Sequence, residues 1–438
     1  MSWQNLKLGE FLINRENRFK PNDRSISGLK RIDKIDFSGK VFLSNKPSNT
    51  DMILVKKGDL VISGINVEKG AMSVYQGEED VIATIHYSTY TFNEKKIDIG
   101  FLKLFLRSPE FKSALKEQVP GGIKTEIKPK HLLHLEVVIP NTVSEQKEVV
   151  NSFSKLETQN FNLENELSYQ DNLLAQLRKA FLRDAIQGKL AKQSSKDGNG
   201  NDLLEKIKAE KEKRKNEKEL PSIKEEEIPF DIPESWVWCR LGEIAYIASG
   251  STPSKDAFVS KGIPYLKMYN LKNQQIAFDY KPQFIKEEVH NGQLKRSRTQ
   301  IGDVMMNIVG PPLGKLAIIP ESLPEANFNQ AGVLIRPHLF KDMNKWIYYY
   351  LNEMSEINSI STKGIAGQDN ISITQSNNIK IPLPPLAEQK RIVKRLEEVM
   401  NLCDELKTTI TDNQNYTDQL LQVALKDALQ MKEVELAT

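Results

Sequence analysis

An α+β fold, built as two repeated units, is predicted from three features of the 438-residue sequence. Short apolar runs of strand type mix with single helical stretches in no regular alternation, which is typical of α+β domains. Two segments of about 43 to 46 residues instead carry a heptad pattern of apolar residues. A globular segment followed by such a segment occurs twice. The sequence therefore predicts two globular α/β domains separated by two long coiled-coil helices.

The repeat has a period of about 243 residues, and its matching motifs keep their order along the chain. The matches are Trp3–Glu10 with Trp236–Glu243, Gly58–Ile62 with Gly302–Met306, Ile139-Pro140 with Ile381-Pro382, Glu145–Lys147 with Glu388–Lys390, and Leu182–Gln187 with Leu425–Gln430. We accordingly divide the chain into a first domain (1–143), a first helix (144–190), a charged linker (191–228), a second domain (229–386) and a second helix (387–438).

The first domain is basic, with 22 basic and 17 acidic residues. A positive balance favours contact with phosphates. One helical stretch covers about Ile99–Gln118. The predicted strand runs are Met52–Val55, Leu60–Ile62, Val81–Ile85 and Tyr90–Phe92.

The first helix begins after Ile139-Pro140, because a residue before proline avoids the helical region, and it is closed by Gly188. The linker after it has ten basic and ten acidic residues and is interpreted as a solvated spacer. The predicted inward positions of the helix are Val149, Phe153, Leu156, Asn160, Leu163, Leu167, Gln170, Leu174, Leu177 and Phe181.

The second domain has 16 basic and 14 acidic residues, one helical stretch (Asn344–Ile357) and strand runs at Val304–Ile308, Leu316–Ile319 and Val333–Ile335. The predicted inward positions of the second helix are Ile392, Leu396, Val399, Cys403, Leu406, Ile410, Asn413, Thr417, Leu420 and Ala424. So narrow a seam, with polar faces elsewhere, favours two helices that bury it against each other over helices packed on a globular core.

Composition excludes several protein classes. The longest apolar runs, such as Ile379–Pro385, are far shorter than the roughly 20 residues of a membrane span. The N-terminus has no basic stretch followed by an apolar one, as a secretory signal would require. Two cysteines, Cys239 and Cys403, cannot form a disulfide framework, so we expect a cytoplasmic protein.

No motif predicts catalysis by this chain. Gly310–Leu313 lacks the asparagine and the aromatic residue of an adenine methyltransferase loop, and no P-loop sequence occurs. Asp80 and Glu94 resemble a nuclease metal site only loosely, and His131 and His134 have no further ligand nearby in sequence. We therefore expect no catalytic residue, no metal site and no cofactor in this chain.

Basic clusters and loops beside the strand runs are the candidate DNA contacts, because lysines position phosphates whereas Asn, Gln and Arg can pair with base edges. In the first domain the candidates are Arg15, Arg18, Lys20, Arg24, Ser63, Asn66, Lys69, Tyr87, Lys124 and Lys128. In the second domain they are Ser251, Thr252, Lys255, Lys267, Tyr269, Asn270, Arg296, Arg298, Asn307, Lys315, Asn329, Gln368 and Asn370.

Four motifs carry a resemblance to a known family: Leu177–Leu190, Ile228–Trp238, Gly302–Lys315 and Ile381–Gln389. With these motifs the whole chain resembles the specificity (S) subunit of type I restriction–modification systems. It departs from the family at Ile139–Glu145, which replaces the usual proline-rich segment and affects the helix boundary more than the function.

The resemblance implies that 1–143 and 229–386 are target recognition domains, each reading half of a bipartite site on double-stranded DNA. It implies that the long helices pair antiparallel as spacers, with the domains at opposite ends. The implied partners are two modification (methyltransferase) subunits, which bind S-adenosylmethionine, and restriction (helicase–nuclease) subunits.

Two other functions remain open on the residues alone. The first is a coiled-coil scaffold that binds proteins without reading DNA, which the basic domains and acidic helices disfavour. The second is a self-contained nuclease that uses Asp80 and Glu94.

Overall fold

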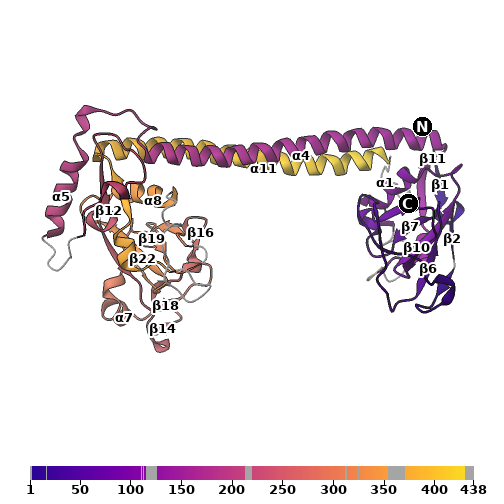
Figure 1. Ribbon diagram of the computed structural model, residues 1–438, viewed down its shortest axis with the longest axis horizontal. Coiled ribbons are helices and arrows are strands. Elements are labelled where there is room, and N and C mark those ends of the chain that lie inside the picture. Colours follow the sequence, from indigo (N-terminus) through magenta and orange to yellow (C-terminus); the bar gives the residue numbers. More distant parts are fainter. Residues whose placement is uncertain are drawn as a thin grey trace, which may run out of the picture. The chain divides into compact units, whose positions relative to one another are not determined.

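The computed structural model describes residues 2–15, 17–109, 111, 113–114, 126–212, 220–310, 313–323, 325–353 and 370–429 (Figure 1). The chain divides into two compact units. Unit 1 contains residues 1–170 and 409–438, and unit 2 contains residues 171–408. Both units mix sheets with helices, which confirms the α+β fold class. Each unit takes one globular part and a portion of each long helix, so a unit boundary crosses both helices.

Unit 1 contains three sheets. The predicted strand runs coincide with β6, β7, β9 and β10. The sheets are β1 (Trp3–Lys7) with β11 (Glu136–Pro140); β2 (Leu12–Asn14), β10 (Tyr87–Phe92), β7 (Leu60–Ser63) and β8 (Met72–Val74) in that order; and β3 (Arg18–Phe19), β6 (Met52–Val55), β9 (Val81–Thr84), β4 (Arg31–Ile35) and β5 (Val41–Ser44) in that order. The short helices are η1 (Leu8–Glu10), η2 (Arg24–Ile26), η3 (Val67–Lys69) and α3 (Pro129–Leu132).

Helix α1 (Ile99–Arg107) closes the core of unit 1. It begins at Asp98, whose side chain accepts a hydrogen bond from the Phe101 backbone N–H at 3.0 Å, as an N-cap should. Its buried face packs with the β2–β10–β7–β8 sheet and with Phe153 of α4 and Leu425 of α11. The core of the first globular part is therefore continuous with the helix pair beside it.

Unit 2 repeats this plan with altered strand lengths. Its sheets are β12 (Val237–Arg240) with β23 (Lys380–Leu383); β13 (Ala245–Ser249), β22 (Gly332–Pro337), β19 (Val304–Asn307) and β20 (Leu316–Ile318); β14 (Phe258–Val259), β18 (Phe284–Ile285), β15 (Ile263–Leu266) and β21 (Asn327–Phe328); and the hairpin β16 (Leu271–Lys272) with β17 (Gln275–Ile276). The helices of its globular part are α6 (Leu241–Ile244), α7 (Glu287–Asn291), α8 (Met343–Glu353) and α10 (Ile373–Asn377), with the short turns η6 (Lys255–Ala257), η7 (Met268–Asn270) and η8 (Lys295–Ser297).

A buried ion pair occurs in both units at the Gly-Asp motif of the repeat. Gly58 in unit 1 has a φ of 85°, and Gly302 in unit 2 has a φ of 90°. This conformation, which favours glycine, turns the chain before β7 and before β19. Asp59 accepts two hydrogen bonds from Arg15 at 2.8 and 2.9 Å, and Asp303 accepts two from Arg336 at 2.6 and 2.7 Å. Arg15 follows β2, whereas Arg336 lies on β22, so the same buried charge receives its counter-charge from different strands.

The linker is not the solvated spacer that its composition predicts. Helix α5 (Gly200–Glu212) buries Leu203, Leu204 and Ile207 in the main core of unit 2. Asp197, in the turn η4 (Ser195–Asp197), pairs with Arg391 at 2.5 Å. Equal numbers of charges masked the apolar positions, which recur at helical spacing and pack against β12 and α6.

The long helices are α4 (Val143–Ile186) and α11 (Leu386–Ala428). One seven-residue series of each predicted seam is turned inward: Phe153, Asn160, Leu167, Leu174 and Phe181 on α4, and Cys403, Ile410, Thr417 and Ala424 on α11. At the start of the seams Val149, Ile392, Leu396 and Val399 are buried too. The other series is exposed, contrary to prediction: Leu156, Leu163, Gln170 and Leu177, and Leu406, Asn413 and Leu420.

Ion pairs between the helices use Asp171, Arg178 and Lys407, each of which directly follows an exposed position. Asp171 pairs with Lys407 at 2.5 Å, and Arg178 pairs with Asp404. An apolar series with a spacing of seven residues can be combined with a second series three positions later or with one four positions later. Both combinations give steps of three and four residues, so periodicity alone could not tell which second series faces the partner helix. The structure leaves the more apolar second series facing outward.

Candidate nucleic-acid interface

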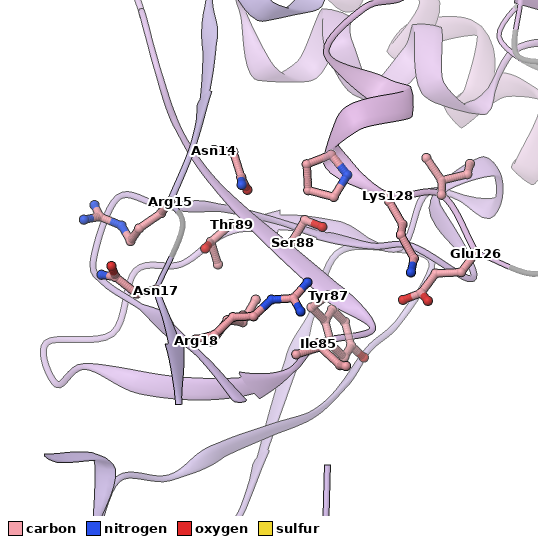
Figure 2. Close-up of a pocket in the computed structure, with 13 residues that line it drawn as sticks. Asn14, Arg15, Asn17, Arg18, Ile85, Tyr87, Ser88, Thr89, Glu126 and Lys128 are labelled. Carbon is pink, nitrogen blue, oxygen red and sulfur yellow. The ribbon is translucent and has the colours of Figure 1, made fainter. Parts of the chain in front are cut away.

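A polar pocket of about 380 Å³ lies in unit 1 where β2 ends and β10 begins (Figure 2). It also borders β3 and the segment leading into α3. Four of the predicted DNA contacts line it, namely Arg15, Arg18, Tyr87 and Lys128. In Figure 2 the Arg18 side chain extends toward Tyr87, and Lys128 extends toward Glu126. The fold thus brings together residues that lie more than 100 positions apart in sequence.

The basic residues of the pocket differ in what they can still bind. Arg15 is held by Asp59, so two of its donors are already engaged. Arg18 and Lys128 are exposed and have no carboxylate within 4.0 Å among the described residues. An exposed guanidinium can donate two parallel hydrogen bonds to guanine or to a phosphate. Arg18 is therefore the residue of this pocket best suited to a nucleic acid.

Hydroxyl and amide groups complete the wall of the pocket. Burial raises the pKa of Tyr87, which keeps its hydroxyl neutral and able to donate. The Thr89 hydroxyl is buried and has no hydrogen-bond partner in the described part of the chain. Asn14 and Asn17 add amides, which can read adenine. Such a set of donors and acceptors suits base edges better than an apolar ligand.

The equivalent sheet edge of unit 2 also gathers polar side chains. There β13 ends, β22 begins and β19 ends, and the segment before α10 crosses them. Thr252 donates a hydrogen bond to Gln330, and Asn307 ends β19 opposite Gly332. Asn329 and Asn370 each keep a buried side-chain oxygen without a hydrogen-bond partner among the residues described. Ser251 and Lys315 lie at the same edge through backbone hydrogen bonds.

Comparison with known proteins identifies the architecture. Residues 233–413 match the family model for the type I restriction modification DNA specificity domain. The type I restriction enzyme EcoAI specificity subunit of Escherichia coli is 30% identical over 267 residues, which cover 58% of this chain and 43% of that protein. Over these residues the chain is similar to type I restriction–modification specificity subunits.

Solved structures share the fold of this chain. The HsdS subunit from Thermoanaerobacter tengcongensis matches with a TM-score of 0.61 at 18% identity, over 98% of this chain and 97% of that chain. A structure concerning complex assembly and conformational transition of the type I R-M system matches with a TM-score of 0.65 at 18% identity and the same coverage. By sequence, the chain spans less than half the length of the first curated relatives that it matches.

Several predicted contacts serve the structure of the chain itself. The Asn270 amide is buried and donates to the carbonyls of Ala277 and Tyr280, so it holds a loop together. Ser63 is buried and accepts a hydrogen bond from the Asn66 backbone at 3.3 Å. Lys20 pairs with Asp51 at 3.1 Å. These contacts leave Asn270 and Ser63 little freedom to meet DNA.

Other predicted contacts lie away from the two sheet edges. Arg298 pairs with Glu325 at 2.8 Å, and hydrogen bonds from Arg298 lower the pKa of that carboxyl. The remainder are the exposed residues Arg24, Lys255 and Arg296, the half-buried Asn66 directly before η3, and the residues Lys69, Lys267 and Tyr269 beside two hairpins. Lys124 and Gln368 lie outside the described residues.

Sequence reasoning missed Asn14, Asn17, Ser88 and Thr89 in unit 1, and Gln330 in unit 2. No strand run was predicted near Asn14 and Asn17. Ser88, Thr89 and Gln330 stand just before the runs predicted to begin at Tyr90 and Val333, where only Tyr87 and Asn329 were selected. Pairing of β10 with β2 and β7, and of β22 with β13, places them at the edge. Aligning the two halves of the repeat by their strand runs could have identified these residues as neighbours of strand ends.

The described residues contain no group of three or more His, Cys, Asp or Glu side chains placed to hold a metal ion. Both cysteines are buried as free thiols, and burial raises the pKa of Cys239. In the same part of the chain, no helix is both long and apolar enough to cross a membrane.

Proposed function

We propose that this chain is the non-catalytic DNA-specificity subunit of a type I restriction–modification complex. Each globular domain reads one half of a bipartite DNA site. The observation that carries this proposal is the duplicated polar sheet edge, with Arg18 and Tyr87 in unit 1 and Thr252, Gln330 and Asn329 in unit 2. Two different sets of donors and acceptors on one scaffold suit two different half-sites.

The long helices set the distance between the half-sites in this proposal. Its support is their continuity, since α4 has 44 residues and α11 has 43, or roughly 65 Å each at 1.5 Å per residue. Adding or removing whole heptads in both helices should change the gap in the recognised sequence and leave both half-sites unchanged.

The helices also dock two modification subunits. Each unit carries an exposed apolar row along its helix pair: Leu163, Tyr416 and Leu420 in unit 1, and Leu406, Leu173 and Leu177 in unit 2. These are equivalent residues of the repeat, 243 positions apart. Exposed leucines at heptad spacing suit a partner helix. Two equivalent rows support two copies of one partner, which would bring S-adenosylmethionine, with restriction subunits joining that assembly.

Coexpression with the modification subunits of the same system tests the proposal. Genome-wide mapping of methylated adenine should find a bipartite motif with a fixed gap. Arg18→Ala should relax or abolish one half of the motif, and Asn329→Ala the other half. Lys20→Ala, at an exposed lysine already paired with Asp51, is the matched control. Absence of any motif that depends on this chain would refute the proposal and favour a protein scaffold.

A further inference from the structure

An exposed pair of aromatic rings marks the β4–β5 hairpin of unit 1. The Asp36 carboxylate accepts backbone hydrogen bonds from Ser38 at 3.0 Å and Lys40 at 2.9 Å, which fixes the turn. Phe37 in the turn is 53% exposed, and Phe42 on β5 is 41% exposed. The turn is attached to the body of the unit, because α1 donates a lysine hydrogen bond to the Ser38 carbonyl at 2.6 Å. The rings are thus held outward on a fixed support.

Unit 2 has a counterpart in the β16–β17 hairpin and the loop that follows it. The hairpin turn is attached to the body through Gln274, which donates to Asn352 of α8 at 2.8 Å and accepts from the Leu316 N–H of β20 at 3.0 Å. Helices α1 and α8 are equivalent in the repeat. Tyr280 in the following loop is 42% exposed, and the ring of Tyr269 meets it edge-on with centroids 5.9 Å apart.

Lysine side chains lie over these exposed rings. Within the part of the chain that the structure describes, all cation–π pairs occur at these two hairpins. They are Lys40 over Phe42 at 5.3 Å, Lys69 over Phe37 at 5.7 Å, Lys272 over Tyr280 at 3.1 Å and Lys281 over Tyr280 at 5.4 Å. The same combination of ring and cation in both halves of the repeat argues against a chance surface feature.

The charge of these lysines is not balanced locally. Among the described residues, none of the four has a carboxylate within 4.0 Å. The two carboxylates of the unit 1 hairpin are already used, since Asp33 pairs with Arg31 at 2.6 Å and Asp36 fixes the turn. Fixed cations beside an apolar ring match a sugar–phosphate backbone, which offers an anion on each side of an apolar sugar.

We infer that the two hairpins grip the DNA backbone, with lysines on phosphates and the aromatic ring against a deoxyribose. The inference rests on the proposed function and adds residues to it. Phe37, Phe42, Lys40 and Lys69 in unit 1, and Tyr280, Lys272 and Lys281 in unit 2, bind without reading sequence. They would strengthen the binding of each half-site and leave its base preference unchanged.

Salt dependence of binding separates phosphate contacts from structural roles. The complex with modification subunits is titrated, by fluorescence anisotropy, with a duplex carrying the methylated motif and with a scrambled duplex. Each phosphate that a lysine neutralises adds about 0.9 to the steepness of the slope of log affinity against log salt, so removing the lysine lowers the steepness by that amount. Lys40→Gln/Lys69→Gln and Lys272→Gln/Lys281→Gln should each lower the slope by about 1.8 on both duplexes.

The aromatic variants give a different signature. Phe37→Ala and Tyr280→Ala should weaken binding about fivefold at constant salt slope, because a ring on a sugar releases no counterion. Lys57→Gln/Lys95→Gln, which changes two exposed lysines outside the hairpins of unit 1, should leave the slope unchanged.

The inference is overturned if the hairpin variants keep the wild-type slope and affinity on both duplexes, or if they fail to assemble with the modification subunits while binding DNA with the wild-type slope. The second outcome would make the hairpins a protein-docking surface. Failure of the proposed function looks different, since the wild-type complex would then methylate no motif, and the slope on the scrambled duplex would still test the hairpins.

Discussion

The exposed leucine row of unit 2 leads to a quantitative prediction about assembly. Leu402, which lies one helical turn before Leu406 of this row on α11, is 56% exposed, and Leu406 is 52% exposed. Burying a whole leucine contributes ~1.5–3 kcal/mol, so covering the exposed half of each contributes about 1 kcal/mol. Leu402→Ala/Leu406→Ala should therefore cost about 2 kcal/mol of binding free energy, or roughly thirtyfold in Kd.

Calorimetric titration with the purified modification subunit measures this effect. The wild-type chain should show two sites, and the double variant should weaken one site about thirtyfold and leave the other unchanged. Tyr416→Ala/Leu420→Ala should weaken the other site, because it changes the row of unit 1. Lys394→Ala, an exposed position of α11 outside the row, is the control. Equal weakening of both sites, or weakening below threefold, would refute the reasoning.

Further predictions concern the fold. Arg336→Met should destabilise unit 2 by about 3 kcal/mol, because it leaves the buried Asp303 carboxylate without its counter-charge. Hydrogen exchange of the backbone amides should become faster in β19 and β22. Unchanged protection of these amides would contradict the prediction. Burial raises the pKa of Glu388, so its ionisation disfavours the folded state, and Glu388→Gln should raise the melting temperature at pH 7. That gain should shrink as the pH falls through the raised pKa and should be lost below 4.5, the usual pKa of the group, and a gain independent of pH would argue against it. Gly200→Ala should destabilise the packing of α5 by about 1–3 kcal/mol, because a Cβ there would come within 3.0 Å of the Leu383 carbonyl oxygen. Faster proteolytic cleavage within 200–212 would report this loss of packing. Resistance equal to that of the wild type would count against close packing at Gly200.

The sequence predicted the repeat and the α+β class because both depend on local patterns. Apolar runs such as Leu60–Ile62 and Val304–Ile308 form the central strands of both units. The interpretation of the linker as a solvated spacer was wrong, because its charge balance says nothing of Leu203 and Ile207. These residues become part of the core only when β12 lies beside them. Burial of that kind depends on contacts distant in sequence.

The candidate site was predictable in part for the same reason. Arg18, Tyr87 and Lys128 have side chains whose chemistry suggests nucleic acid wherever they lie. Their meeting in one pocket depends on the pairing of β10 with β2, which no local pattern contains. Asn270 shows the converse, since an amide suited to a base is used to hold a loop. Residue type limits what a side chain can bind, and the fold decides what it does bind.

The two buried aspartates have a consequence for recombination between relatives. Each carboxylate finds its arginine inside its own unit, although the arginine comes from different strands in the two units. Each globular part is therefore electrostatically self-contained at its most deeply buried ion pair. A chimaera that exchanges one whole globular part keeps the aspartate of the other part with its own arginine. Exchange of β22 alone would separate Asp303 from its arginine, so viable crossovers should fall outside the globular parts.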